Sequence, residues 1–512
     1  MKETVLKIAL FGAIVLGITF TACKTDGIGS GGQDALQTIP DDASGIVAVN
    51  LPSILEKMDY ENYRNTDGFK KRVAEAKQQD PLYGAILEDP EAAGIALNQK
   101  AYLSIGFAEN SANEDFSAFV VSLSDADKFE ATVQAQSGKT IKAQDGFKSI
   151  QLDRQTTLGW NDEYVIIANS SSYVNMDENL ARFFNMEKGS SIAQNKNLSK
   201  ALSKEHDINT WLTSNPIAGN PQAGMAMAMA EVDPEALKDN FVHGYVDFLD
   251  GQIKGEADLE IQKALSKDLD LLFKDEAKTD FSPYISNEGL QFLMVNSLDI
   301  KGIHELLSAR PNSKGFLDFA LREYGLTIQD IADTFGGDVM VASYDSDGRL
   351  GAAGVFATDI KDEKKLSDFL NLAVEKKMLE TEGDNTYKII AMRYSGQNGG
   401  FDVNFEDGMP RLLIHDGKLF ITGNQTFLDK IAGGGFSKSE RVSNDKMKLV
   451  KNNILTALFT ATPESLKNFG PTDLDGLKVE DVIFQANRKK LLFDMQLENK
   501  KENALKQMVE TE

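Results

Sequence analysis

The sequence predicts an α+β fold made of two tandem, internally duplicated units, each an antiparallel sheet of about seven strands with helices packed mainly on one face. Three observations support this prediction. The phrase WNDEYVIIAN at 160–169 returns as HDGKLFITGN at 415–424. Other segments recur in the same order along the two halves. Strand-like segments also follow one another directly, whereas Rossmann folds and barrels alternate strands with helices.

The two opening phrases have the pattern of a β-hairpin. Asn161-Asp162 and Asp416-Gly417 each precede an apolar run rich in β-branched and aromatic residues. Asn, Asp and Gly tolerate the positive φ that two-residue hairpin turns require. The segments before these turns, TTLGW and RLLIH, supply the incoming strands.

Five further pairs of segments keep the same order, and the spacing between partners drifts only by loop-sized amounts. Shared order is stronger evidence of duplication than similarity at one site. The pairs are 45–58 with 290–307, 100–107 with 337–344, 118–133 with 353–370, 225–238 with 456–467, and 243–261 with 481–499.

Several helices are expected between these strands. Ser124 is a candidate N-cap with Asp127 three residues later, in the manner of a capping box. Asp233-Pro234 and Thr462-Pro463 each place a capping residue before a proline at the first helical position. Helices at 64–97 and from 317 are expected as insertions that cap the sheets. Helices from 264 and from 504 are expected to end the first and the second unit.

The amino terminus resembles a bacterial lipoprotein signal. Lys2 and Lys7 precede an apolar run from Ile8 to Phe20, which is too short to span a bilayer as a helix but has the length of a signal-peptide core. The chain's single cysteine, Cys23, follows directly in the sequence TAC. The resemblance implies cleavage before Cys23 and acylation of that residue. The alternative is an ordinary secreted protein with an incidental cysteine.

These features divide the chain into four expected regions. Residues 1–22 are the lipoprotein signal peptide, and 23–38, rich in Gly, Ser and charged residues, are a flexible tether. The first α+β repeat unit spans 39–278 and the second spans 279–512. With one cysteine, an intramolecular disulfide is impossible, so each unit must be held by its hydrophobic core.

The segment IPDDASGIVAVNLPSIL at 39–55, after such a signal and before two halves, resembles an uncharacterised family of Bacteroidetes lipoproteins, domain of unknown function 4836. The resemblance implies a location and an architecture. It supplies no catalytic residues, because that family has none established.

Charge and flanking residues limit the partners and the location. The formal net charge is −24 in 512 residues, and an acidic surface repels phosphate backbones, so no nucleic-acid partner is expected. Lys24 rather than Asp follows the cysteine. By analogy with the enterobacterial sorting signal, this favours the outer membrane. The periplasmic face is favoured over the cell surface, because only Asp26 follows where a surface-export signal is acidic.

Each segment that resembles a phosphate-, calcium- or metal-binding motif lacks residues that the motif requires or has a plainer interpretation. QAQSGKT, ending at Thr140, lacks the first glycine of a phosphate loop, because that place holds Val133. YDSDGR at 344–349 lacks the remaining ligands of a calcium loop and suits a hairpin turn. The four histidines are isolated. MAMAMA at 225–230 could present a thioether row to Cu(I), but a soft core strand is the plainer interpretation.

The sequence therefore predicts a membrane-anchored envelope protein with a non-catalytic binding or structural role, acting through a protein or glycan partner where the two units meet. No catalytic, cofactor-binding or metal residue is assigned, no cofactor is expected, and Cys23 is the lipid attachment site. The alternative is an envelope hydrolase, or a glycan- or peptide-capture protein, with a site built from loops at the cleft between the units. Exposed aromatic residues near Trp160, Tyr173 or Trp211 would favour glycan capture, and a buried carboxylate pair would favour hydrolysis.

Overall fold

The computed structural model describes most of the chain from Ala35 onward. The described ranges are 35–107, 115–170, 176–187, 189–219, 224–225, 227–228, 231–277, 279–322, 325–345, 353–390, 410–450, 453–460 and 477–510.

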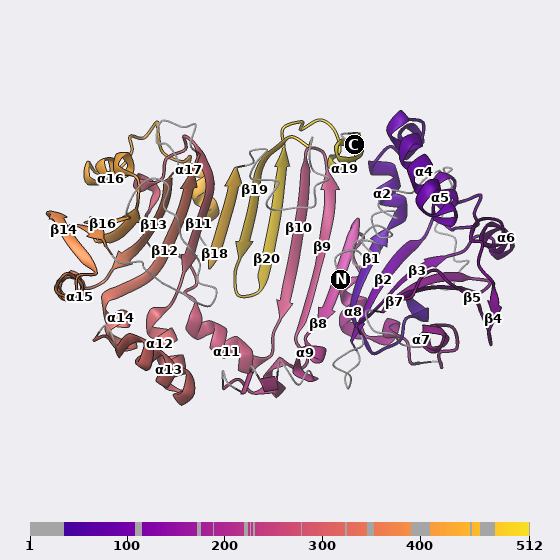
Figure 1. The fold of residues 1–512 in the computed structure, drawn as a ribbon, viewed down its shortest axis with the longest axis horizontal. Helices are drawn as coiled ribbons and strands as arrows, with labels where there is room; N and C mark the ends of the chain where they lie inside the picture. Colours follow the sequence, from indigo (N-terminus) through magenta and orange to yellow (C-terminus); the bar gives the residue numbers. More distant parts are fainter. Residues whose placement is uncertain are drawn as a thin grey trace.

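The described strands form one continuous antiparallel sheet, in the order β4-β5-β6-β7-β3-β2-β1-β8-β9-β10-β20-β19-β18-β11-β12-β13-β17-β16-β15-β14 (Figure 1). The strands before the middle of the sheet are β1 (Ala43–Asn50), β2 (Lys100–Phe107), β3 (Asp115–Ser122), β4 (Lys142–Ala143), β5 (Lys148–Gln151), β6 (Thr156–Trp160), β7 (Tyr164–Ser170), β8 (Ile208–Thr213), β9 (Phe241–Leu249) and β10 (Gln252–Glu260). Those after it are β11 (Leu290–Ser297), β12 (Phe335–Tyr344), β13 (Ala353–Ile360), β14 (Leu379–Gly383), β15 (Thr386–Ile389), β16 (Arg411–His415), β17 (Lys418–Thr422), β18 (Leu455–Thr460), β19 (Val479–Ala486) and β20 (Lys490–Leu497).

The helices lie mostly at the two ends of the sheet and along its lower edge in Figure 1. Those that precede β11 in the chain are η1 (Ala35–Thr38), α2 (Leu51–Lys57), α3 (Tyr60–Tyr63), α4 (Asp67–Gln79), α5 (Pro81–Glu88), α6 (Ala126–Gln136), α7 (Met176–Phe184), η2 (Ile192–Gln194), α8 (Lys196–Ala201), α9 (Asn215–Gly219), η3 (Pro234–Leu237), α11 (Lys263–Leu272) and η4 (Ser282–Tyr284). The later ones are α12 (Ile300–Ser308), α13 (Pro311–Arg322), α14 (Ile328–Thr334), α15 (Glu363–Glu375), α16 (Gln425–Ala432), α17 (Asn444–Val450) and α19 (Ala504–Glu510).

The order of strands is the same when read outward from the centre in either direction. Strands β1–β10 on one side and β11–β20 on the other pair in matching sequence, and the two halves meet where β10 pairs with β20. Both expected hairpins are present, since Trp160 pairs with Val165 and His415 with Lys418. The two-residue turn with positive φ occurs at Asp416-Gly417, whereas four residues separate Trp160 from Val165 and neither Asn161 nor Asp162 has a positive φ. The chain is therefore an α+β protein, and every described strand pairing is antiparallel, unlike a Rossmann fold.

The number and separation of the sheets differ from the prediction. Each half contributes ten described strands to a single sheet, rather than about seven to a sheet of its own. Strands β4 and β5, of two and four residues, are too short to carry a clear alternation of apolar residues. The joining of the halves depends on strand edges, and sequence periodicity contains no information about which edges meet.

The expected correspondence between segments 225–238 and 456–467 of the two halves is wrong. Gly224–Met225 and Met227–Ala228 are helical, and the strand that occupies the place of β18 in the other half is β8, with the sequence INTWLT. Met225 is 67% exposed, whereas Met227 is 8% exposed. The alternation of Met with Ala, a strong helix former, does not make a strand without a neighbour to pair with.

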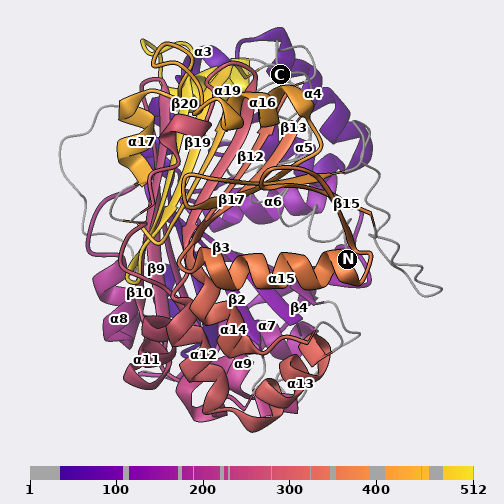
Figure 2. The same cartoon turned by 90° about the vertical axis from the view of Figure 1, so that its left-hand side faces the viewer.

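Helices cover both faces of the outer strands, which corrects the expectation of one covered face. On one face, α2, α4, α5 and α6 pack on β1, β2, β3 and β7. On the opposite face, η1, α7 and α8 cover the same strands, and α16 and α17 cover β11, β12 and β13. Figure 2 accordingly shows α4 and α5 on one side of the central strands and α8 and α17 on the other. Strand β7 is buried along its whole length, so both of its faces require a cover.

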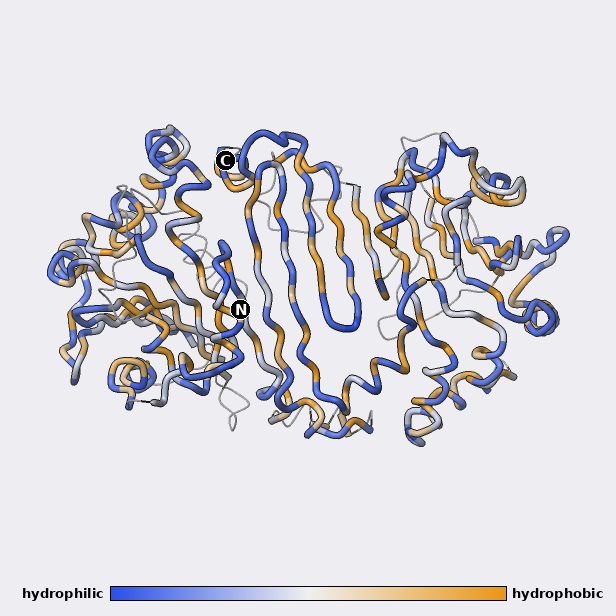
Figure 3. The backbone as a smooth tube through the Cα atoms, turned by 180° about the vertical axis from the view of Figure 1, so that it is seen from behind, coloured by the Kyte–Doolittle hydropathy of each residue, from blue (hydrophilic) through white to orange (hydrophobic). Residues whose placement is uncertain are grey.

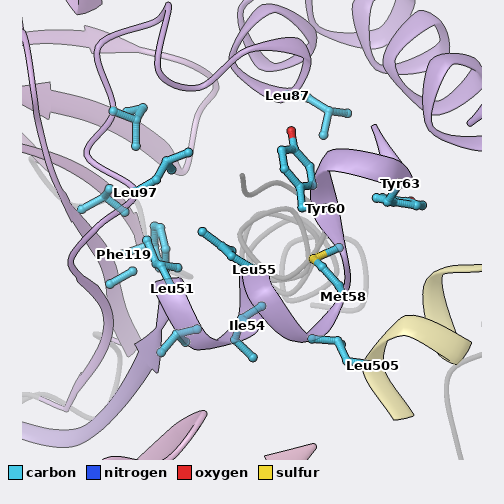
Figure 4. Packing of buried hydrophobic residues seen from close by; sticks show 14 of the residues in the cluster. Leu51, Ile54, Leu55, Met58, Tyr60, Tyr63, Leu87, Leu97, Phe119 and Leu505 are labelled. Atoms are coloured by element: carbon cyan, nitrogen blue, oxygen red, sulfur yellow. The ribbon is translucent and has the colours of Figure 1, made fainter. Parts of the chain in front are cut away.

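The last helix of each half packs against the other half. Leu505 of α19 lies beside Ile54 and Met58 of α2 in one core (Figure 4). Next to this contact, Lys506 pairs with Asp59. Correspondingly, α11 follows β10 but packs on α12 of the second half. The two halves therefore share cores as well as a sheet.

Local signals were predicted well, with two exceptions. The N-cap of α6 is Asp125, whose side chain accepts from the backbone N–H of Lys128, rather than Ser124. Asp233 caps η3 as expected, whereas Thr462 lies outside the described residues. In addition, the last four residues of the expected tether, 35–38, form η1 with Ala35 and Leu36 buried.

Two glycines test whether α11 packs closely on α12 of the second half. A Cβ on Gly302 of α12 would lie 2.1 Å from the carbonyl oxygen of Leu271, whereas a Cβ on Gly315 of α13 would meet nothing within 4 Å. We expect Gly302→Ala to lower the free energy of unfolding by at least about 1 kcal/mol, because the two helices must separate. The matched change Gly315→Ala should raise it by about 0.5–1 kcal/mol, since alanine is the better helix former. Urea unfolding measures both, and equal effects would contradict the close packing of α11 on α12.

Candidate functional site

The six strands at the centre of the sheet have one apolar face. Alternate residues of a strand point to the same side, and cross-strand partners share a side. The residues on this side, which we call the apolar strip, are Ile208, Thr210, Leu212, Val242, Gly244, Val246, Phe248, Ile253, Gly255, Ala257, Leu259, Leu491, Phe493, Met495, Leu497, Val479, Val482, Phe484, Ala486, Leu455, Ala457 and Phe459. All except Thr210 are apolar or glycine.

Part of the apolar strip is open to solvent. Phe248, Ile253 and Leu497 are buried in the core that α19 and α2 share. Leu212, Phe484 and Leu491, in contrast, are 44%, 41% and 44% exposed. Figures 1 and 3 show the middle strands free of any labelled or coloured helix over their central part, from the front and from behind. Large apolar side chains on β8, β19 and β20 are thus left accessible, on both sides of the β10·β20 pairing.

The small side chains on this face are grouped where β9 pairs with β10. Gly244 of β9 lies opposite Ala257 of β10, and Gly255 lies opposite Val246. The flanking strands carry longer side chains, among them Leu212 and Leu491. The relief of the apolar strip is therefore low in the row formed by Gly244 and Ala257, and higher at Val242, Val246 and Leu259 of the same two strands and at Leu491 beside Ala257.

The opposite face of the same strands is charged. Lys254 lies opposite Asp494, and Lys490 pairs with Glu256 and lies 3.5 Å from Asp258. Tyr245 donates a hydrogen bond to Glu256. On β9, β10 and β20 this face is mostly polar, whereas on β8 and β18 it carries Trp211 and Leu458, which are buried in the cores under the helices.

A buried carboxylate, Asp207, joins α2 to the central strands. Its side chain is 1% exposed and accepts hydrogen bonds from the Ser53 hydroxyl at 2.5 Å, from Lys57 at 2.6 Å and from the backbone N–H of Phe248 at 2.7 Å. Beside it, His206 Nδ1 lies 2.8 Å from Asp247, and the imidazole stacks on Tyr245. Every oxygen of Asp207 is engaged, so the group holds structure together rather than offering a base.

A second buried carboxylate cluster lies at the start of β12. Asp338 is fully buried and accepts from Lys274 Nζ at 3.0 Å, from the Ser297 hydroxyl at 2.7 Å and from the backbone N–H of Thr279 at 2.7 Å. Its own N–H donates to Asp359 at 2.8 Å. This is the carboxylate pair that the sequence could not locate, because its members come from two strands.

The two carboxyl groups of this pair are shifted in opposite directions. Burial alone would raise the pKa of Asp338, but the hydrogen bonds from Ser297, Lys274 and Thr279 outweigh burial and hold it below its ordinary value of 3.8. Burial, together with the negative charge of Asp338, raises the pKa of Asp359. Opposed shifts are typical of acid–base pairs. Here, however, Asp338 is saturated by partners and fully buried, so a structural role explains the cluster.

The remaining residues singled out from the sequence fall in three groups. Trp160 and Trp211 are each 2% exposed and belong to the cores, so neither offers a platform for a sugar ring. Cys23 and Tyr173 lie outside the described residues. Among the residues that the structure describes, no group of three His, Cys, Asp or Glu side chains could hold a metal ion, and no helix is long and apolar enough to span a bilayer.

The apolar strip could have been recognised in the sequence, though it was not. The hairpins 241–260 and 479–497 alternate apolar and polar residues on both strands, which shows that each has one apolar face. That the two faces join into one, and that part of the joint face is open, follows only from the pairing of β10 with β20.

These features define a class of protein: an α+β chain built on one long antiparallel sheet, with an open apolar face at the centre. Within that class, the chain belongs to the family described as a domain of unknown function (DUF4836), which matches residues 36–433.

Other comparisons add little. No curated protein matches the chain. Among solved structures, it is similar to crystal form IV of TP0453, with 11% identity and a TM-score of 0.27 over 44% of this chain and 80% of that one. Form III gives 11% and 0.28 over 49% and 83%, and form I gives 12% and 0.27 over 49% and 82%. Likenesses this weak carry no argument about function.

Changing either carboxylate of the Asp338–Asp359 pair to Asn should shift the free energy of unfolding, but in opposite directions. We expect Asp338→Asn to lower the free energy of unfolding at pH 7 by about 3 kcal/mol, because Lys274 loses its charged partner and a buried acceptor is removed. Asp359→Asn should instead raise it, because the amide oxygen can still accept from the Asp338 N–H while the repulsion between the carboxylates disappears. Urea unfolding at pH 7 measures both.

The pH dependence provides the control. Asp338 has a lowered pKa, so its contribution to stability is present above pH 3.8 and is lost as the pH falls through the lower folded value. Asp359 has a raised pKa, so the gain from Asp359→Asn should vanish as the pH falls below its folded pKa. A gain that does not depend on pH would contradict the charge repulsion.

Proposed function

We propose that this chain is a lipid-anchored protein of the bacterial envelope that has no catalytic role and holds an apolar partner on the apolar strip. The observation that carries the proposal is the uncharged central face, with Leu212, Phe484 and Leu491 left more than 40% exposed. Soluble proteins rarely leave such side chains together at a junction unless the surface binds something.

The position of the apolar strip supports the proposal. It lies where the two halves meet, which is where binding sites often form. Its boundaries are set by α19 and α2 on one side and by α11 and α12 on the other, so rigid elements fix the surface before any partner arrives. A preformed site loses little conformational entropy on binding.

We further propose that the two halves arose by internal duplication, with units at 39–278 and 279–512. The matching order of ten strands on each side of β10·β20 supports this, as does the order of the recurring sequence segments. Duplication explains why the apolar strip is built symmetrically: each half contributes one hairpin, β9–β10 or β19–β20, to the centre.

Residues 1–22 act in this proposal as a signal peptide and Cys23 as the acylated residue, as in the Bacteroidetes lipoproteins that the sequence resembles. Eleven residues lie between Cys23 and Ala35, the first described residue, and the twelve Cα–Cα steps can reach about 40 Å. The folded body then stays close to the membrane, which we place at the periplasmic face of the outer membrane.

The apolar strip can be tested with an apolar dye, 8-anilinonaphthalene-1-sulfonate, on a purified chain that begins at Lys24 and so keeps every described residue. We expect bright emission from the folded protein and a loss of at least half of it in the double variant Phe484→Ser, Leu491→Ser. The matched control is Phe316→Ser, Phe319→Ser on α13, where both side chains are 73% exposed but lie away from the apolar strip.

Circular dichroism confirms in parallel that each variant is folded. Emission that survives the double change on the strip, or that falls only in the α13 control, would show that the strip does not bind apolar compounds.

Lipid attachment has a separate test. In cells fed an alkyne-bearing fatty acid, the wild-type chain should become labelled, and Cys23→Ala should carry no label, because acylation requires the thiol. Label on Cys23→Ala, or an unlabelled wild-type chain, would refute the anchor while leaving the dye experiment unaffected.

A further inference from the structure

We infer that the occupant of the apolar strip is the acyl chain of a free membrane lipid. The inference rests on the proposed function, since it names the partner of the same surface. Four properties of the described residues support this occupant over a protein: the absence of hydrogen-bonding groups, the size of the open area, its relief, and its isolation from charge.

The apolar strip offers almost nothing to a polar partner. Of its side chains only Thr210 carries a hydrogen-bonding group, and the backbone groups of β8, β9, β10, β20, β19 and β18 are paired within the sheet. Protein interfaces make about one hydrogen bond per 100–200 Å². A hydrocarbon chain requires none, so it matches this surface without leaving polar groups unpaired.

The size of the open area also favours a small ligand. Six strands about 4.8 Å apart span about 24 Å, and three alternating residues along a strand span about 13 Å. The resulting area, on the order of 300 Å², is well below the roughly 800 Å² that each partner of a stable protein complex buries. It is long enough for an acyl chain, because a chain in one leaflet of a bilayer covers about 15 Å.

The relief of the apolar strip gives such a chain a path. Gly244 and Ala257 form a low row across β9 and β10, with Leu491 at one end of the row and Val242, Val246 and Leu259 along its sides. A flexible methylene chain lying on the small residues would contact both flanks. Each CH₂ removed from water contributes about 0.8 kcal/mol, so a long chain binds and a short one does not.

The distribution of charged residues also suits an uncharged acyl chain. The chain carries a formal net charge of −24, yet no charged residue occurs on the apolar strip, and the charged side chains of the same strands point to the opposite face. An uncharged tail is therefore the part of a lipid that this surface accepts, and the head group remains outside it.

The test measures binding of palmitate, a 16-carbon fatty acid, to the chain that begins at Lys24, by native mass spectrometry and by displacement of the dye. We expect one or more bound palmitates and at least tenfold weaker binding of butyrate. Ala257→Phe, which keeps the surface apolar but fills the low row, should weaken palmitate binding at least tenfold, as should Leu491→Asp. Phe316→Ser should leave it unchanged.

The outcomes separate the inference from the proposed function. Dye binding without palmitate binding would overturn the acyl chain and leave an apolar partner of another kind. Absence of both would overturn the inference and the proposed function together. A dimer by light scattering that Leu491→Asp dissociates would identify a second copy as the occupant, and so refute the lipid.

The acyl groups of Cys23 are the remaining source of the same chemistry. The fully acylated protein is compared with the chain that begins at Lys24, in a detergent that does not prevent the latter from binding palmitate. If both bind palmitate equally well, the occupant is a free lipid. If acylation blocks uptake and Cys23→Ala restores it, the protein's own anchor occupies the apolar strip and the inference is wrong.

Discussion

The pairing of β10 with β20 is the contact on which the rest of the molecule depends. Seven residues of each strand are aligned, from Gln252 opposite Gln496 to Asp258 opposite Lys490. Each of these strands would otherwise be an open sheet edge, which exposes unpaired N–H and C=O groups and invites aggregation. Pairing them with each other leaves only β4, two residues long, and β14, with Glu380 and Glu382, at the outer edges of the described sheet.

The same pairing determines where helices can lie. Because the halves meet edge to edge, the segments that follow β10 and β20 leave the sheet beside the opposite half, and α11 and α19 pack there on α12 and α2. These helices stand at the borders of the central strands rather than over their middle. The apolar face that each hairpin brings to the centre is therefore covered at its margins and open between them.

Sequence patterns predicted what is local and missed what is long-range. The hairpin turn at Asp416-Gly417 and the cap at Asp233 depend on residues a few positions apart, and both are present. The strand predicted at 225–230 was wrong, because Met–Ala alternation alone does not provide the neighbouring strand that a β-strand must pair with. The strand that carries Trp211, β8, was overlooked because INTWLT alternates weakly. The Asp338–Asp359 cluster and the apolar strip both require partners that only the folded sheet brings together.

The central claim is that one sheet runs through both halves in this register, and a disulfide tests it directly. In a Cys23→Ala background, Lys254→Cys combined with Asp494→Cys places two thiols directly opposite across β10 and β20, within disulfide reach. Lys254→Cys with Leu492→Cys places them on a diagonal about 7–8 Å apart, which is too far. The account predicts rapid oxidation of the first pair and slow or no oxidation of the second. The reverse order, or no cross-link in either, would contradict it.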